Sequence, residues 1–357
     1  MIPFSDNHLF RKCLDRIFQN ASKLKDTRIM EVCGTHTMEI GRSGLRSLLP
    51  SNIELISGPG CPVCVTPASV IDTACHLARN GTTILTFGDM VRVPGNRESL
   101  ENAKSNGGKV EALLTPLQAV KIARENPHQI YVFIAAGFET TTPVIARTIW
   151  NASQQKIDNL FFLVAHRTVP PALIALMEDK TISVHGFLLP GHVCSITGIA
   201  PFADILHNRF PAVITGFKPL DIAMGIMAIT DMLVKQSAET VNMYSRVARD
   251  EGNPLAQKLV DSVFRPADAL WRGIGMIPQS GLSLKDEFAG FDARSRFTIE
   301  PDDEKMPCGC RCGNVLKGQI KPSDCPLFGS LCTPDHPVGP CMVSSEGSCA
   351  AWYKFGG

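Results

Sequence analysis

The sequence lacks a strong net charge, long apolar runs and the glycine motifs of nucleotide-binding folds. Lys and Arg number 35 against 34 Asp and Glu in 357 residues. This balance provides no basic field for nucleic acid, and there is no acidic tail. No stretch reaches the roughly 18 uninterrupted apolar residues of a membrane span. We therefore expect a protein that binds neither nucleic acid nor membrane and recognises its partners at specific sites.

Residues 1–8 do not combine a charged region with a following apolar one, which is the pattern of a secretory signal. We therefore expect a soluble cytoplasmic protein. Thiols stay reduced in that compartment, so the 13 cysteines indicate metal or redox chemistry before structural disulfides.

A Cys-x-x-Cys pair, Cys61 and Cys64, lies in a Gly/Pro-rich turn directly after the apolar run 53–56, and a helix is predicted to start at Thr66. Both thiols thus lie between the end of a strand and the N-terminus of a helix. The helix dipole there favours the thiolate, the form that attacks disulfides and binds metals. The alternative is a pair of small buried side chains in a turn.

The chain repeats one unit, an apolar strand followed by a polar loop and a helix that often begins at a proline. Strands are predicted at residues 28–32, 53–56, 82–87, 109–114, 129–135, 159–164, 183–189 and 212–215. Each run is continuously apolar, which is typical of parallel sheets covered by helices on both faces. We expect an α/β protein with two similar parallel-sheet lobes facing a cleft, because ligands bind at the carboxyl ends of such strands.

Four of these strands precede residue 126 and four follow it. The predicted divisions are a first α/β lobe at 1–126, a second lobe with bridging helices at 127–300, and a small irregular Cys-rich domain at 301–357. Further helices are predicted at 219–234 and, interrupted at 251–254, at 240–263, whereas 271–291 looks irregular.

The C-terminal segment carries cysteines among many prolines and glycines, so it needs a metal or another crosslink to fold. These are Cys308, Cys310, Cys312, Cys325, Cys332, Cys341 and Cys349. Their spacing fits neither paired zinc knuckles nor the ferredoxin run, and a [4Fe–4S] cluster and structural zinc are both open. The predicted ligands are Cys325, Cys332, Cys341 and Cys349, with Cys310 or Cys312 as alternates.

Cys33 and His36 lie three residues apart at the end of the first strand. As nucleophile and base they would resemble a cysteine hydrolase, but no orienting third group is evident. Iron binding by Cys33 together with Cys61 and Cys64 is favoured, because three soft thiolates near one point suit iron. The alternative for His36 is a hydrogen-bonded loop histidine.

Polar residues also follow later strands. Glu139, His166 and His192 are predicted to face the cleft, either directly or as hydrogen-bonding groups behind its wall. The loop 137–141 precedes a helix and is suited to hold an anion on its N–H groups. Because nucleotide-binding glycine spacings are lacking, we predict no nucleotide cofactor.

Four motifs, in order, resemble those of the HypD family of [NiFe] hydrogenase maturation factors. They are CGTHT at 33–37, GPGCPVCVTP at 58–67, GFETT at 137–141 and CMVSSEG at 341–347. The resemblance runs from about residue 28 to the C-terminus. It implies two α/β domains and a small [4Fe–4S] domain.

The resemblance also implies a role. Such a protein acts with HypC as a redox-active scaffold on which the Fe(CN)₂CO unit is assembled, and HypE delivers cyanide made with HypF. By motif, Cys33 corresponds to the cysteine that holds this iron, Cys61 and Cys64 to the redox-active pair, and His36 to a group behind Cys33. A rival is an iron–sulfur disulfide reductase acting on a dithiol partner, which does not need Cys33. A third alternative is a protein-binding module that is stabilised by structural zinc.

Overall fold

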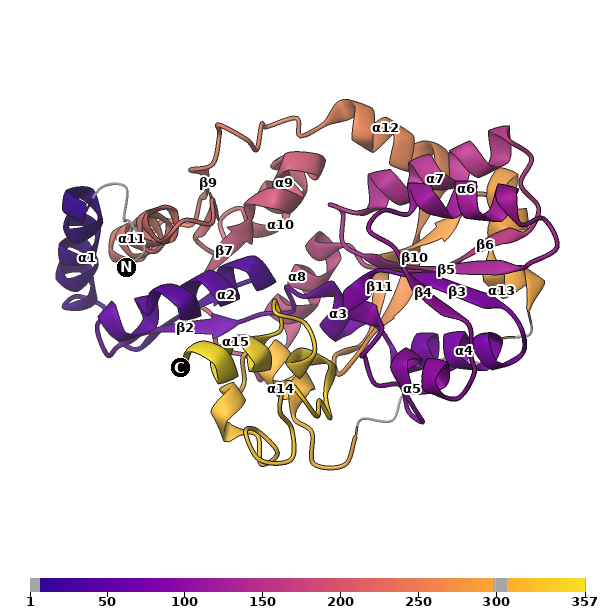
Figure 1. The fold of residues 1–357 in the computed structure, drawn as a ribbon. Helices are drawn as coiled ribbons and strands as arrows, with labels where there is room; N and C mark the ends of the chain where they lie inside the picture. The colour runs from indigo at the N-terminus through magenta and orange to yellow at the C-terminus, as the bar shows by residue number, and fades with distance from the viewer. Residues whose placement is uncertain (1–6, 298, 300–306, 357) are drawn as a thin grey trace.

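The computed structural model describes residues 7–297, 299 and 307–356. Two lobes, each built on a parallel sheet, lie side by side, and the C-terminal Cys-rich segment, yellow in Figure 1, lies against the junction between them. The α/β class with two parallel-sheet lobes, predicted from the continuously apolar strands, is confirmed.

Both sheets are entirely parallel. Sheet A has the order β2 (Ile53–Ser57), β1 (Thr27–Glu31), β7 (Gly186–Pro190), β8 (Ala212–Thr215) and β9 (Thr240–Asn242). Sheet B has the order β4 (Val110–Ala112), β3 (Thr83–Thr86), β5 (Tyr131–Gly137) and β6 (Leu160–His166). An antiparallel hairpin consists of β10 (Phe264–Trp271) and β11 (Gly275–Leu284).

The sheets do not divide the chain at residue 126. Ile29 of β1 lies opposite Gly186 of β7 in sheet A, whereas β3 and β4 belong with β5 and β6 in sheet B. The chain crosses from sheet A to sheet B after β2 and returns after β6. The Cys-x-x-Cys turn makes the first of these crossings. An apolar run predicts a strand, but packing between distant segments decides which sheet it joins.

Helices connect the strands and cover the sheets. In chain order they are α1 (Asn7–Ala21), α2 (Gly34–Ser43), α3 (Pro62–Val65), α4 (Ala68–Arg79), α5 (Leu100–Ser105), α6 (Leu117–Glu125), α7 (Thr142–Gln154), α8 (Val169–Glu178), α9 (Gly191–Thr197), α10 (Ala200–Leu206), α11 (Pro219–Lys235), α12 (Pro254–Val263), α13 (Ala293–Arg296), α14 (Cys312–Leu316) and α15 (Ser348–Phe355). On sheet A, Ile17 of α1 and Ile226 of α11 join Leu188 of β7 in one core. In the described part of the chain, no helix combines the length and apolar character needed to cross a membrane.

Two segments differ from the sequence prediction. The helix predicted at 240–263 is wrong in its first half, because Thr240 pairs with Ala212 in β9 and turns follow as far as residue 253. The side chain of Asn253 accepts a hydrogen bond from the N–H of Ala256 and starts α12. Much of the stretch at 271–291 that looked irregular belongs to the β10–β11 hairpin.

Candidate functional site

A cavity of about 320 Å³ lies where loops from the two lobes face each other. Sheet A contributes Cys33 after β1, Pro62 after β2 and His192 after β7. After β3 and around the end of β5, sheet B contributes Phe87, Asp89, Met90, Ala136, Gly137, Phe138, Thr140 and Thr141. The strands' carboxyl ends therefore meet at one cleft, as parallel α/β sheets require of a ligand site.

Cys61 and Cys64 form a disulfide, with their Cα atoms 5.3 Å apart. Cys61 precedes α3, and its Sγ accepts a hydrogen bond from the N–H of Cys64 at 3.2 Å. Both side chains are buried, while Pro62 and Val63 between them line the cavity. The pair thus lies at a strand end and a helix N-terminus, directly behind the cavity wall.

Cys33 lies next to this turn. It immediately precedes α2 and is half-buried at the cavity. The N–H of Gly34 donates to the carbonyl oxygen of Gly60 at 2.9 Å, and a Cβ atom at Gly60 would collide with the backbone of Cys33. The turn that carries the disulfide and the loop that carries Cys33 are therefore in direct backbone contact.

Glu346 brings the C-terminal segment to the same place. Its Oε1 accepts a hydrogen bond from Oγ1 of Thr35 at 2.6 Å, and its backbone packs on Gly34, where a Cβ would come within 2.6 Å of it. Burial, and after it the carboxylate of Glu346, raise the pKa of the Cys33 thiol to about 11, although hydrogen bonds from the start of α2 act in the opposite direction. The sequence analysis included Glu346 in a motif but did not place it in the cleft.

His36 and His192 are linked through Phe217. The ring of Phe217 stacks with His36 at 4.6 Å and with His192 at 3.8 Å between centroids. Nε2 of His36 lies 3.0 Å from the carbonyl oxygen of Gly216, and burial lowers the pKa of His36 to about 4. His192 lines the cavity and His36 does not. His36 is therefore a neutral histidine that holds Phe217, and through it His192, in place.

Glu139 and His166 lie behind the cavity wall. Oε1 of Glu139 accepts from the N–H of Val169 at 2.8 Å, whereas no donor among the described residues reaches Oε2. Burial raises the pKa of Glu139 to about 7 and lowers that of His166 to about 3, so His166 is neutral. Neither side chain lines the cavity.

The buried thiol of Cys194 was missed by the sequence analysis. Burial raises its pKa, and the nearby charges of Glu139 and Cys33 raise it further. Cys194 therefore lies close to both groups. The available signal was its position in the first turn of the helix that follows β7, since such turns face the cleft.

Thiols gather in the C-terminal segment. Sγ of Cys310 lies 3.3 Å from Sγ of Cys312, and the thiol of Cys341 makes hydrogen bonds with those of Cys312 and Cys349. Hydrogen bonds with the thiols of Cys312 and Cys341 lower the pKa of Cys349 to about 6. Sγ of Cys332 accepts from the N–H of Val338 at 3.3 Å. Cys332 also lies near Cys310 and Cys312, so five of the cysteines lie close together, four of them buried and Cys310 half-buried.

The two remaining cysteines lie at the margin. Cys325 is buried, with its Sγ 4.0 Å from the carbonyl oxygen of Gly309 beside Cys310, while Cys308 is exposed. In the described part of the chain, no three His, Cys, Asp or Glu side chains converge to hold a single metal ion. Soft, buried thiols are nevertheless the donor set of an iron–sulfur cluster, in which separate irons take separate thiolates. The residues present therefore fit such a group.

This thiol cluster touches the disulfide. Sγ of Cys64 lies 3.9 Å from the carbonyl oxygen of Pro340, whose neighbour in the chain is Cys341. A Cβ atom at Gly339 would come within 2.5 Å of Sγ of Cys312. Residues 339–341 therefore connect the disulfide with the cluster of cysteines, while Glu346 connects the same segment with Cys33.

The fold and the site together define a two-lobed α/β protein with a thiol-lined cleft and a Cys-rich segment seated on it. A family model named HypD, described as "Hydrogenase formation hypA family", matches residues 8–356. The chain therefore belongs to the HypD family of hydrogenase maturation factors.

Similar proteins have closely similar lengths. The "Hydrogenase maturation factor HypD" of Escherichia coli K12 is 41% identical over 350 residues, which cover 96% of this chain and 94% of that protein. The protein of the same name from Azotobacter vinelandii is 40% identical over 362 residues, covering 99% and 96%. The "Hydrogenase expression/formation protein HupD" of Azotobacter chroococcum is 41% identical over 362 residues, covering 99% and 96%.

Proposed function

We propose that this protein is a redox-active scaffold in hydrogenase maturation. With HypC it holds iron at Cys33 while the Fe(CN)₂CO unit is assembled, and it receives cyanide from HypE, downstream of HypF. The observation that carries the proposal is the contact between Gly60 and Cys33, because it sets a two-electron thiol pair beside a single thiol at one cavity.

Iron is the substrate of this scaffold. Soft thiolates suit iron, and the cavity presents Cys33 to an incoming metal while Cys61 and Cys64 remain behind its wall. The thiol of Cys33 holds its proton up to about pH 11 in the free protein, so metal binding displaces that proton. His192, whose ring stacks on Phe217, lines the same cavity as Cys33 and has a ring nitrogen that can accept this proton.

The dithiol form of Cys61 and Cys64 supplies the electrons for cyanide release. A thiocyanate group on a cysteine of the partner reacts with the two thiols of Cys61 and Cys64. The products are the free thiol of the partner, hydrogen cyanide and the Cys61–Cys64 disulfide. The carbon–sulfur bond of the thiocyanate breaks, the Cys61–Cys64 bond forms, and two protons pass to the products. This step would leave the pair as a disulfide, which is the form that Cys61 and Cys64 have in the structure.

Two electrons and two protons must then restore the dithiol. We propose that the C-terminal cysteines Cys325, Cys332, Cys341 and Cys349, with Cys310 or Cys312 as alternates, hold a [4Fe–4S] cluster. When bound, this group supplies electrons singly. The carbonyl of Pro340 beside Sγ of Cys64 supports the proposal, because it places the Cys-rich segment in contact with the pair that must be reduced.

Iron content tests the proposal against a disulfide reductase. The protein is isolated anaerobically with HypC, as wild type and as Cys33→Ala, and iron and acid-labile sulfide are measured. A [4Fe–4S] cluster contains equal amounts of iron and sulfide, so iron in excess of sulfide measures the iron held at the cleft. If the protein is a scaffold, Cys33→Ala should lose this excess iron and should no longer support maturation. If the protein is a disulfide reductase, Cys33→Ala should keep its iron and its activity on a protein disulfide, since that chemistry needs only Cys61, Cys64 and the cluster. Equal iron in both proteins, with unimpaired maturation, contradicts the scaffold.

A further inference from the structure

The turn of the β10–β11 hairpin lies between the disulfide and the thiol cluster. Trp271 fixes this turn, since it is fully buried, its Nε1 donates to Oγ of Ser280 at 2.7 Å, and its ring stacks on Phe138 at 5.8 Å between centroids. Figure 1 shows the hairpin beside α3 and above the C-terminal segment. The residue after Trp271 is an arginine.

Arg272 contacts the Cys-x-x-Cys helix on one side. Its N–H donates to the carbonyl oxygen of Val65, the last residue of α3, at 2.9 Å. Its Nη1 donates to the carbonyl oxygen of Pro94 at 2.7 Å. Only 1% of its surface is exposed. A guanidinium keeps its proton even when buried, so the hairpin carries a permanent positive charge into the interior.

The thiol cluster lies on the other side. Gly273 packs so closely on Gly313 of α14 that a Cβ atom at Gly313 would overlap its backbone. Gly313 follows Cys312 directly in α14, so the residue after Arg272 lies against the start of the helix that carries a cysteine of the cluster. Arg272 is therefore a buried cation between Cys64 and the first cysteines of the cluster.

We propose that Arg272 is the counter-charge of the redox group held by the C-terminal cysteines and sets its reduction potential. The inference deepens the proposed function and rests on it. Adding an electron to a thiolate-bound iron–sulfur group makes it more negative, and a buried cation, weakly screened by solvent, stabilises that reduced form. Arg272 thereby makes the group easier to reduce. It is a positioning residue, because its role is exerted through its charge.

A purely structural role is the competing account, since the side chain of Arg272 also donates to the carbonyl oxygen of Pro94. The two accounts predict different reduction potentials when Arg272 is replaced by lysine or by methionine. Arg272→Lys keeps the charge but not the fork of donors, whereas Arg272→Met keeps the length but not the charge. The counter-charge account predicts a shifted potential for methionine alone.

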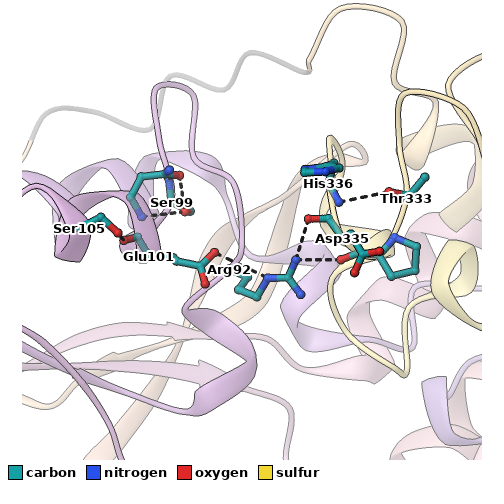
Figure 2. Close-up of polar contacts among 9 residues, drawn as sticks. Arg92, Ser99, Glu101, Ser105, Thr333, Asp335 and His336 are labelled. Carbon is teal, nitrogen blue, oxygen red and sulfur yellow. Dashed lines mark hydrogen bonds and ion pairs between the residues drawn. The ribbon is translucent and has the colours of Figure 1, made fainter.

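Arg92 offers a matched control (Figure 2). Its Nη2 donates to the carbonyl oxygens of Pro334 at 2.8 Å and Asp335 at 3.0 Å, so it also ties the Cys-rich segment to the sheet-B lobe. Its side chain is 41% exposed, however, and lies near Glu101 at 3.7 Å. Solvent screens such a charge. Arg92→Met therefore removes an anchor of the same segment without removing a buried charge.

The experiment is an anaerobic redox titration of the full chain, followed by visible absorption, with iron and sulfide content matched. The midpoint potential of Arg272→Met should lie below that of the wild type. At the wild-type midpoint, the ratio of reduced to oxidised group should be roughly tenfold lower in the variant, which corresponds to a shift of about 59 mV for one electron. Arg272→Lys and Arg92→Met should shift much less. An unchanged midpoint in Arg272→Met, or an equal shift in Arg272→Lys, overturns the inference.

Variants that fail to hold iron still decide the question. Loss of iron from Arg272→Met and Arg272→Gln, with retention in Arg272→Lys, supports a required positive charge. Loss from Arg272→Lys as well assigns Arg272 a structural role and overturns the inference. If the wild type itself holds no iron and sulfide, the proposed cluster fails and the inference fails with it, which separates that case from an unshifted potential in a loaded protein.

Discussion

Gly60 lies against the backbone of Cys33, and no side chain fits between them. The carbonyl of Gly60 also accepts the N–H of Gly34 at 2.9 Å, so the contact is held by a hydrogen bond as well as by packing. One crossing of the chain between its two sheets thus carries the Cys61–Cys64 disulfide to Cys33 at the cleft. The site depends on this backbone contact.

Gly60→Ala should therefore disrupt the site. The added methyl group meets backbone atoms that cannot rotate away, so we expect a loss of stability of about 1–3 kcal/mol and a failure of hydrogenase maturation. Urea unfolding and complementation of a strain that lacks the maturation factor measure the two effects. Gly290→Ala is the control, because nothing lies within 4 Å of a Cβ there. Wild-type behaviour of Gly60→Ala would show that the contact is dispensable.

The two cysteines of the pair should be required individually. Cys61→Ala and Cys64→Ala each remove the capacity to supply two electrons, and we expect both to abolish ligand loading while the thermal unfolding midpoint changes little. Cys75→Ala, a buried cysteine of α4 outside the cavity lining, should leave maturation intact. Normal hydrogenase maturation in either variant of the pair contradicts a redox role for it.

The positions of the strands could be predicted from the sequence better than their order in the sheets. The continuously apolar runs around Ile29 and Val213 predicted strands of sheet A, because burial on both faces demands such runs. The pairing of Ile29 with Gly186 was not predicted, since it joins segments far apart in the chain and depends on packing alone. The strand at Thr240 was predicted as helix, because an edge strand of only three residues is too short to show the alternation of polar and apolar side chains.

The site was predicted in part for similar reasons. Cys33 and the Cys-x-x-Cys turn follow strands of one sheet, so their meeting could be inferred from the strand–loop pattern. Glu346 and Arg272 reach the site from later segments without a repeating pattern, and only the folded chain places them there. His36 was predicted as a group behind Cys33 or as a hydrogen-bonded histidine, and Gly216 and Phe217 hold its ring away from the cavity.

His36 should make stability depend on pH. Its pKa is about 4 in the folded protein and about 6.5 when unfolded, so the unfolded chain gains the proton first as pH falls. Its contribution is complete above pH 6.5 and is lost on acidification towards pH 4. Between pH 7 and pH 5 this amounts to about 2 kcal/mol.

His36→Phe removes this titration while keeping a ring beside Phe217. Urea unfolding at pH 7 and pH 5 should show about 2 kcal/mol less acid destabilisation than in the wild type. Other buried groups, such as Glu139, titrate equally in both proteins and cancel. The exposed His128→Phe should leave the wild-type difference unchanged. The same acid sensitivity in His36→Phe and wild type would mean that His36 is protonated in the folded protein.

The C-terminal thiols should hold the Cys-rich segment in place. Cys349→Ser removes a thiol that bonds to Cys312 and Cys341, and we expect it to lose visible absorbance and bound iron and to expose residues 307–356 to proteolysis. Cys13→Ser, a buried position in α1, is the control and should retain the absorbance. An unchanged anaerobic spectrum in Cys349→Ser would remove this cysteine from the ligand set.

The most direct measurement is an anaerobic infrared spectrum of the protein isolated with HypC, for wild type and for Cys33→Ala. Cyanide and carbonyl stretches should be present in the wild type and absent from the variant, because we propose that the thiol of Cys33 holds the iron at the cleft. Their absence from both proteins, with the thiol-bound cluster intact and HypC bound, would contradict the scaffold and favour a disulfide reductase.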